Sequence, residues 1–557
     1  MVEYKGQICF TNLKERKKGE LMMDRKLFLL FVCFSIIVGV LLFTSCEIDS
    51  QYTKELVFEL QEDGYHVVDL GDTESVDIII PEKYKGEPVV AIDQGAFDGS
   101  KINSIFIPNT VKNIGKRAFS GCELTMLTIE SDKLWVDYDA FFGCVNLKKV
   151  NFNGNIAEWC EFYFENEEAS PFNTGAEFYL NDALVENLVI PKDAYYIGQF
   201  AFAKIPNIKT VKFEDGSNCY EIRSRAFQGC PSLQVIEMPQ AMKIIGSMSF
   251  SGCSALESIS FDLVSSLLRF EEYAFVGCNN LHDVYITGDC EKWLDIEKKF
   301  EYSSPLSNGA DLYFDGQLVE HLTISSESLP KGALSGCTSI KTIEFAEGVK
   351  TIGTYALSDC VNLEKVTISA TAKNIEYGAF DWCDSLSEVH FNGTLKDWML
   401  ISFEDVSANP LFNHSDLYIG NELLKNLVIP EGITDIYMNT FAGCTSIETV
   451  NVPGHVFSIK YYAFFECPNI TTVVIDEGVR YIRTQAFFGC ESVEYVRLPS
   501  SLESFGYESD IFNGSMKFIT FEYNDTVEKW ESIARHRPLG YLVNGYIIIC
   551  TNGSITE

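Results

Sequence analysis

A short phrase, Ala-Phe-x-Gly-Cys, recurs along this chain and is followed at fixed offsets by Leu, Val and Ile. It begins at the alanines of five clear copies, Ala118, Ala140, Ala226, Ala274 and Ala486. Degenerate copies lie between them, so that within a group the step is 22 to 25 residues, and between groups it is about sixty. Self-similarity at such a period is typical of a solenoid, in which each unit buries its apolar face only by stacking on the next.

The segment after each cysteine, Leu-x-x-Val-x-Ile, predicts one short strand per repeat. Its period-two alternation turns Leu and Val or Ile inward and the intervening residues outward. A step of 20 to 29 residues with one strand belongs to the leucine-rich repeat class. We therefore expect a strand-rich leucine-rich repeat solenoid, with parallel β-structure on the concave face and short irregular or 3-10 segments on the convex face. The repeated phenylalanines should form an internal aromatic stack.

Long gaps between the repeat groups form a second periodic pattern. Each gap carries a tryptophan at the same slot, namely Trp159, Trp293, Trp398 and, in a shortened C-terminal copy, Trp530. Asn155, Asp289 or Thr394 stands four residues before the tryptophan and can cap a short helix. A proline follows, and then a hairpin, for which Asp315 and Gly316 offer a type I′ turn. The gaps therefore predict coils enlarged by a helix and a ribbon.

These patterns predict one long repeat domain in a chain of 557 residues. Residues 1–46 are a leader and signal peptide, and residues 47–93 a linker and N-terminal cap. The repeat array occupies 94–520, with inserts at 151–191, 285–325 and 390–430, and residues 521–557 cap the open end. Caps are expected because the ends of a solenoid would otherwise expose its core.

The N-terminal region carries a targeting signal. Asp24-Arg25-Lys26 precedes an unbroken apolar run from Leu27 to Phe43, and Thr44, Ser45 and Cys46 follow. Such an order is typical of a secretory signal. Phe-Thr-Ser-Cys resembles a bacterial lipobox, in which the cysteine is lipidated and becomes the mature N-terminus, although Phe43 stands where leucine is usual. The resemblance implies a lipid-anchored surface protein with Cys46 as the lipidation site. A single uncleaved membrane anchor and a secreted protein are the alternatives.

Eleven of the 18 cysteines occupy one slot of the repeat: Cys122, Cys144, Cys230, Cys253, Cys278, Cys337, Cys360, Cys383, Cys444, Cys467 and Cys490. Equivalent residues of stacked coils lie about 4.8 Å apart, but their Cβ vectors run parallel, which disfavours disulfides. We expect an inward ladder of free thiols. No Cys-x-x-Cys pair or Cys/His cluster has the spacing of a zinc site, so no metal is predicted.

The net charge is −36, from 79 acidic and 43 basic residues. Such a surface repels phosphate backbones, and nucleic acid is therefore disfavoured as a partner. The seven histidines are scattered, and the chain has no nucleophile motif, phosphate loop or dinucleotide fingerprint. The sequence predicts no catalytic residue, no cofactor and no enzymatic activity.

The whole phrase, with Ile114-Gly115 before Ala-Phe, resembles the BspA-like family of leucine-rich repeat proteins, and the match covers nearly everything from about residue 52 onward. The resemblance implies a cell-surface or secreted protein, since some members bind matrix proteins or mediate attachment between cells. It names no ligand, because one scaffold hosts many unrelated partners.

Two surfaces are candidates for binding. The outward strand row is polar and of mixed charge, which suits a broad contact with an extracellular protein or a glycan. Its candidate residues are Tyr285, His390, Asn451, Tyr495 and Arg497. The inserts supply Trp159, Trp293 and Trp398, since aromatic residues are common in interface hot spots. The competing interpretation is that each tryptophan covers the insert's own small core.

Three functions therefore remain open at this point. The first is a surface lipoprotein that recognises a protein, matrix or glycan ligand, as an adhesin does. The second is an envelope scaffold without a specific ligand. The third is a glycan-processing enzyme, which would need a pair of acidic residues at catalytic separation.

Overall fold

A computed structural model describes residues 52–263, 269–288, 290–298, 303–505, 510–534, 539 and 544–556. The described residues from Thr53 onward form one compact unit. Cys46, the predicted lipidation site, Asp289, the predicted helix cap of the second insert, and the predicted leader at 1–46 lie outside the described residues.

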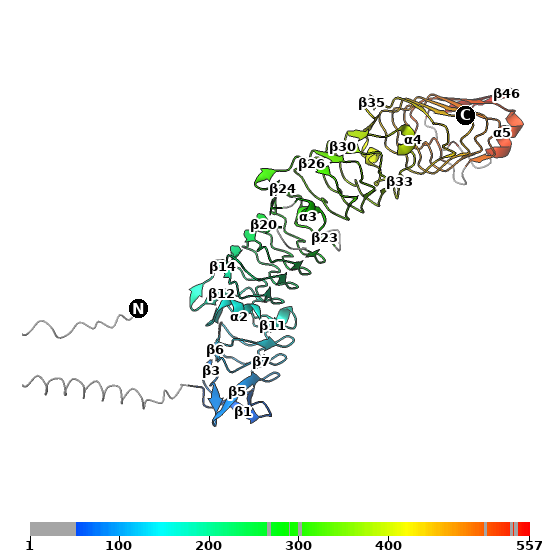
Figure 1. Ribbon diagram of the computed structural model, residues 1–557. Helices are drawn as coiled ribbons and strands as arrows, with labels where there is room; N and C mark the ends of the chain where they lie inside the picture. The colour runs from blue at the N-terminus through cyan, green and yellow to red at the C-terminus, as the bar shows by residue number, and fades with distance from the viewer. Residues whose placement is uncertain are drawn as a thin grey trace, which may run out of the picture. The chain divides into compact units, whose positions relative to one another are not determined.

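The unit is a strand-rich parallel solenoid of about 20 turns with few helices, as the repeat predicts. Figure 1 shows its successive coils side by side, and the parallel pairing of each strand with its counterpart one coil later holds them together. Each regular coil contributes a strand of three to five residues on one face, which we call the long-strand face. Its second strand, usually of two residues, forms the short-strand face.

The long-strand face is divided into four sheets, each of which defines a block. Block one holds β3 (Asp77–Ile79), β6 (Ser104–Ile107), β8 (Met126–Ile129), β10 (Lys149–Phe152), β12 (Glu177–Leu180) and β13 (Ala183–Leu184). Block two holds β14 (Asn187–Ile190), β16 (Thr210–Phe213), β18 (Val235–Glu237), β20 (Ser258–Asp262), β22 (Asp283–Thr287), β24 (Asp311–Phe314) and β25 (Gln317–Leu318).

Block three holds β26 (His321–Ile324), β28 (Thr342–Phe345), β30 (Lys365–Ile368), β32 (Glu388–Phe391), β34 (Asp416–Ile419) and β35 (Glu422–Leu423). Block four holds β36 (Asn426–Val428), β38 (Thr449–Val452), β40 (Thr472–Ile475), β42 (Tyr495–Leu498), β44 (Ile519–Tyr523), β45 (Tyr546–Cys550) and β46 (Gly553–Thr556).

The short-strand face also forms four sheets, where the sequence led us to expect irregular or 3-10 segments. Its strands are β5 (Glu87–Ile92), β7 (Asn113–Ile114), β9 (Trp135–Val136), β11 (Tyr163–Phe164), β15 (Tyr196–Ile197), β17 (Glu221–Ile222), β19 (Ile244–Ile245), β21 (Arg269–Phe270), β23 (Glu297–Lys298), β27 (Ser328–Leu329), β29 (Thr351–Ile352), β31 (Asn374–Ile375), β33 (Ser402–Phe403), β37 (Asp435–Ile436), β39 (Ser458–Ile459), β41 (Tyr481–Ile482) and β43 (Ser504–Phe505). At the N-terminal end β1 (Val57–Leu60), β2 (Tyr65–Asp69) and β4 (Lys83–Tyr84) complete the first of these sheets.

The inserts have the predicted form of an enlarged coil. Their helices are α2 (Ile156–Cys160), α3 (Cys290–Leu294), α4 (Leu395–Trp398) and the C-terminal α5 (Val527–Ile533), and the 3-10 turns η1 (Glu167–Ala169), η2 (Pro305–Asn308) and η3 (Pro410–Asn413) follow the first three. Asn155 and Thr394 cap their helices in capping boxes with Glu158 and Asp397, which confirms these two predicted caps. An antiparallel hairpin then ends each of the first three blocks.

At each boundary between blocks a side chain replaces the main-chain ladder. Asn207 Oδ1 accepts the Phe178 amide at 2.9 Å, and its Nδ2 donates to the Val185 carbonyl at 2.7 Å. Ser339 and Ser446 accept the amides of Leu312 and Leu417 in the same way, at 3.0 and 3.1 Å. The hairpin thus ends one sheet, and a single polar side chain from the next block satisfies the buried amide that the hairpin leaves.

The core contains the predicted stack of phenylalanines. Phe227, Phe250 and Phe275 of successive coils are fully buried, with ring centroids 5.4 and 5.3 Å apart and nearly parallel planes. The stack ends where the inserts intervene, and there Phe178 meets Phe202 edge-on at 5.9 Å. Because each ring packs on the ring of the next coil, the stack helps to hold neighbouring coils in register.

The repeat cysteines are buried and free throughout the described part of the chain, as expected. Most donate to the carbonyl oxygen of the stacked residue one coil earlier: Cys122 to Phe97 at 2.8 Å, Cys253 to Phe227 at 3.0 Å and Cys467 to Phe441 at 3.0 Å. A thiol is small enough to sit between coils and still supplies a weak donor. The cysteine slot therefore satisfies a carbonyl oxygen inside the core.

The residue just before Ala-Phe adopts a left-handed backbone conformation. Arg225, Tyr273 and Tyr355 have φ angles of 58°, 55° and 52°, while Gly332 and Gly378 occupy the same place in other coils. A positive φ costs about 1 kcal/mol for a residue with a side chain. The coil geometry, rather than local preference, imposes this turn.

Candidate interaction surface

The outward row of the long-strand face is partly exposed, as the strand pattern predicts. In β30, Val366 and Ile368 are buried while Lys365 and Thr367 reach solvent, and most other long strands repeat this alternation; β10 is an exception, since its outward Asn151 is buried. Tyr285 lies on β22, His390 on β32 and Asn451 on β38, all in this row and all partly exposed. The candidates from the strands therefore lie where the sequence places them.

The two candidates on β42 each contact a neighbouring carboxylate. Arg497 Nη2 pairs with Asp476 at 2.5 Å, and the Tyr495 hydroxyl donates to Glu522 of β44. That hydrogen bond, together with burial, raises the pKa of Tyr495. These side chains form a polar surface that is already hydrogen-bonded across the sheet, as in a broad and wet interface.

The three tryptophans do not belong to an exposed surface. Trp159, Trp293 and Trp398 are fully buried, so the expectation that they bind a partner is wrong, and the competing interpretation of an insert core is confirmed. In the first insert the Trp159 ring packs against Phe152 and Phe178 inside the enlarged coil. The indole nitrogens of Trp159 and Trp398 donate to the carbonyls of Ala201 and Thr440, at 2.8 and 3.1 Å.

The second insert differs from the other two at one core position. Phe164 and Phe403 lie 6.3 and 5.4 Å from the tryptophans of their own inserts. The corresponding residue of the second insert is Lys298, which is 5% exposed and places its Nζ 5.6 Å from the Trp293 ring centroid. Burial lowers the pKa of this amine to about 7, because an ammonium ion loses its hydration there.

Three insert tyrosines extend the outward row, and the sequence interpretation assigned them to the inserts instead. Tyr179, Tyr313 and Tyr418 lie on β12, β24 and β34, which pair in register with the preceding strands β10, β22 and β32. The alternating segments Glu-Phe-Tyr-Leu and Asp-Leu-Tyr-Phe match the strand pattern and could have revealed this. Each tyrosine therefore stands beside an outward residue of the previous coil.

Two of these tyrosines stack on the residue beside them. Tyr285 and Tyr313 have ring centroids 4.7 Å apart at 29°, and His390 and Tyr418 are 4.2 Å apart at 3°. The Tyr285 hydroxyl donates to Asp283 at 3.0 Å, and burial, reinforced by this carboxylate, raises the pKa of Tyr285. The row thus carries paired aromatic rings next to carboxylates.

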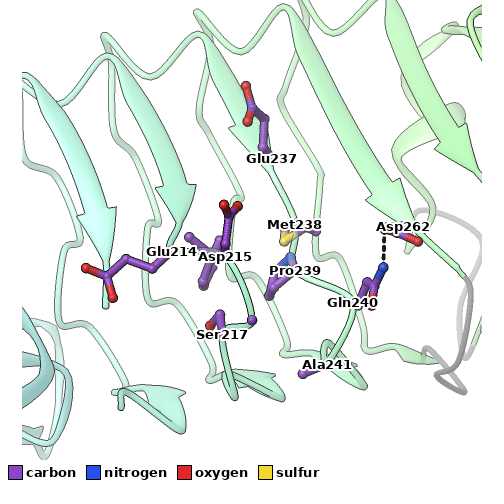
Figure 2. Close-up of a pocket in the computed structure, with 11 residues that line it drawn as sticks. Glu214, Asp215, Ser217, Glu237, Met238, Pro239, Gln240, Ala241 and Asp262 are labelled. Atoms are coloured by element: carbon purple, nitrogen blue, oxygen red, sulfur yellow. Dashed lines mark hydrogen bonds between the residues drawn. The ribbon is translucent and has the colours of Figure 1, made fainter. Parts of the chain in front are cut away.

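A hollow of about 460 Å³ lies at the ends of β16, β18 and β20. Figure 2 shows carboxylates of Glu214, Asp215, Glu237 and Asp262 around it, with Met238, Pro239 and Ala241 among the apolar residues that line it. Gln240 Nε2 donates to Asp262 at 2.7 Å. The lining residues include neither histidine nor cysteine, so they offer no thiol or imidazole for covalent catalysis. The hollow adds negative charge to the outer surface of block two.

Within the described ranges no group of three or more His, Cys, Asp or Glu residues is placed to hold a metal ion. None of the helices in the described part is both long and apolar enough to cross a membrane.

Comparison with known structures finds leucine-rich repeat proteins. A leucine-rich repeat protein from Bacteroides ovatus is 21% identical, with 85% of this chain and 99% of that one covered and a TM-score of 0.39. A leucine-rich cell surface protein from Faecalibacterium prausnitzii is also 21% identical, with 63% and 97% covered and a TM-score of 0.35. The pneumococcal vaccine antigen PcpA is 15% identical, with 89% and 99% covered and a TM-score of 0.24.

No curated protein sequence matches the chain. The family model described as a BspA type leucine rich repeat region (6 copies) matches residues 76–180, 173–306, 311–422 and 412–534. These matches span most of the chain and coincide with the stacked coils and their inserts. The chain belongs to the BspA-type leucine-rich repeat family.

Proposed function

We propose that this protein is a lipid-anchored surface protein that binds an extracellular protein or glycan through the outward row of its long-strand face, and that it has no catalytic role. The leucine-rich repeat fold is consistent with protein binding in general, and neighbouring structures include a named cell surface protein. Cys46 is the proposed attachment point for the lipid, which would hold the solenoid at the outer face of a membrane.

The observation that carries the proposal is the outward row itself. Four successive sheets present partly exposed polar and aromatic side chains at regular spacing, such as Tyr285, His390 and Tyr495. Repeat proteins use surfaces of this kind to contact large partners, because every coil adds its own outward residues to the contact surface. Interfaces enriched in tyrosine and arginine, with hydrogen-bonded polar groups around them, are typical of protein recognition.

A binding panel tests the proposal. The full chain, displayed on cells and also purified in detergent, is offered matrix proteins, whole cells and glycans, with an unrelated lipoprotein as the inert control. Binding above the control is expected, together with weakening when outward residues such as His390 and Tyr495 are replaced by alanine. Equal binding by the chain and the control would contradict the proposal.

An experiment must also distinguish ligand recognition from the alternative role of an envelope scaffold. Deleting an insert cannot separate them, because Trp159 and Phe178 belong to the core and their loss would unfold the coils around them. Substitution of exposed residues is the cleaner test, since surface changes usually leave stability within about 0.5 kcal/mol. Attachment that survives every outward substitution would favour the scaffold.

A further inference from the structure

The outer surface of block two is acidic. Its carboxylates lie on strands β18, β20, β22 and β24 and on the loop after β16: Glu214, Asp215, Glu237, Asp262, Asp283 and Asp311. Among the outward positions of its described strands, Lys212 is the one lysine or arginine, and its Nζ lies 2.6 Å from Glu237. Acidic side chains therefore outnumber lysine and arginine among these outward strand positions, and a cationic group would be attracted to this face.

A stacked tyrosine pair lies within this charge. In the register of β22 and β24, Asp283 stands opposite Asp311 and Tyr285 opposite Tyr313. We call these four residues the tyrosine–aspartate plate. On its other side Tyr285, which is partly exposed, stands opposite Ser260 of β20, a residue with a short side chain. A planar cation stacked on Tyr285 from that side would lie beside the Asp283 carboxylate.

In block one a lysine of the chain itself supplies the cation beside the corresponding tyrosine ring. Lys149 and Tyr179 occupy the places that correspond to Asp283 and Tyr313 in block two. Lys149 Nζ lies 4.5 Å from the Tyr179 ring centroid and 3.3 Å from Asp182. In block two Asp283 replaces this lysine, so that place carries a carboxylate instead of an ammonium ion.

Block three is closer to neutral at the equivalent place. Glu388 there contacts His390 at 3.0 Å and Lys365 at 3.4 Å. In block two Asp283 contacts His282 Nδ1 at 3.2 Å, and the position that corresponds to Lys365 is occupied by Ser258, which carries no charge.

We propose that the tyrosine–aspartate plate binds an arginine-rich segment of a partner protein, with one guanidinium stacked on Tyr285 over Ser260 and paired with Asp283. Neighbouring arginines of the segment meet Asp311, Glu237 and Asp262 along the same face. This inference rests on the proposed recognition function and makes it more specific. The segment of the partner that binds the plate is a basic peptide. Arginine fits better than lysine, because its planar group can stack and pair with a carboxylate at once.

The test uses the full chain in detergent and a fluorescent nona-arginine peptide, followed by anisotropy at 150 mM salt. The variants are Asp283→Asn with Asp311→Asn, Tyr285→Ala with Tyr313→Ala, and Ser260→Phe, which covers the ring face without changing the charge. Each is expected to weaken binding at least tenfold. The matched control, Glu494→Gln with Glu522→Gln, removes two carboxylates from block four and is expected to change binding less than twofold. A nona-lysine peptide is expected to bind several-fold more weakly.

Three results would overturn the assignment. The first is no measurable peptide binding, and the second is unchanged affinity in Ser260→Phe or in the tyrosine double variant. The third is equal weakening by the block four control, which would show attraction by net charge alone. Capture of an extracellular partner by the full chain that persists in the Asp283→Asn, Asp311→Asn variant would leave the recognition function standing while removing the plate from it.

Discussion

The Cys253 thiol donates to the main-chain carbonyl oxygen of Phe227, one coil earlier, at 3.0 Å. Both residues are fully buried, so this oxygen has no access to water. The pKa of Cys253 is raised well above its usual value, because burial disfavours the thiolate. The thiol therefore stays protonated and remains a donor across the physiological pH range.

Replacing Cys253 by alanine should lower the free energy of unfolding by about 1–3 kcal/mol, because the Phe227 carbonyl keeps only the Cys230 amide as a donor and a small cavity opens. Cys253→Ser retains a donor and should lose less. Urea denaturation of the full chain, followed by circular dichroism, measures both. An alanine variant as stable as the parent chain would show that the hydrogen bond contributes nothing.

The buried Trp398 and the exposed Trp382 make a matched pair for testing the insert core. Trp398→Ala should destabilise the fold by about 3–5 kcal/mol, because it opens a large cavity and leaves the Thr440 carbonyl without its indole donor. Trp382 is 63% exposed, and Trp382→Ala should change stability by less than about 0.5 kcal/mol. Thermal unfolding of the two variants checks this difference. Similar losses in both would contradict the assignment of Trp398 to the core.

Lys298 should make stability depend on pH. Its pKa in the folded chain is about 7, whereas an unfolded lysine titrates near about 10.4. Between these values the unfolded chain binds more protons, so the contribution of Lys298 to the free energy of unfolding rises with pH by up to about 1.4 kcal/mol per unit. Below pH 7 the full penalty of a buried ammonium ion remains.

Lys298→Met, which removes that ammonium ion, should therefore stabilise the chain most at pH 6 to 7, with a gain that shrinks steadily toward pH 10. Comparing the variant with the parent chain at each pH cancels the titration of the buried cysteines and tyrosines. Lys331→Met, at a position that is exposed, is the control and should show no such trend. A gain for Lys298→Met that is constant from pH 6 to 10 would mean that the amine is not buried in the charged form.

Cys46 can be tested by processing. Cys46→Ser should abolish incorporation of labelled fatty acid and leave the precursor uncleaved, because the lipid-carrying thiol is lost. Cys33→Ser, within the apolar run, is the matched control and should mature normally. Metabolic labelling and the mass of the mature chain measure both. Normal maturation of Cys46→Ser would contradict lipidation and favour an uncleaved anchor or a secreted protein.

The sequence predicted the features that depend on local repetition. Stacked phenylalanines, free inward thiols, the caps Asn155 and Thr394, and the Asp315-Gly316 turn all follow from patterns within a few residues. The turn is confirmed by φ angles of 46° and 76°. Each of these is decided by side-chain size, hydrogen bonding or backbone preference close by in the chain.

Features that depend on the neighbouring coil were missed. The two-residue strands of the short-strand face form only because coils stack, and a segment such as Tyr481-Ile482 is too short to show alternation. The inward direction of Trp159 depends on packing inside the enlarged coil. The stacking of Tyr313 on Tyr285 depends on the register between coils 28 residues apart. The burial of Lys298 has no local signal in the sequence, because its slot becomes visible only when the three inserts are superposed.

The boundaries between blocks have a mechanical meaning. Within a block, neighbouring coils share a ladder of main-chain hydrogen bonds on both faces, whereas at a boundary Asn207, Ser339 or Ser446 spans the break on the long-strand face. A pulling force along the solenoid would meet three places at which the strand ladder of the long-strand face is interrupted. We expect extension to proceed block by block, so that a partner held by one block stays bound while another block unravels.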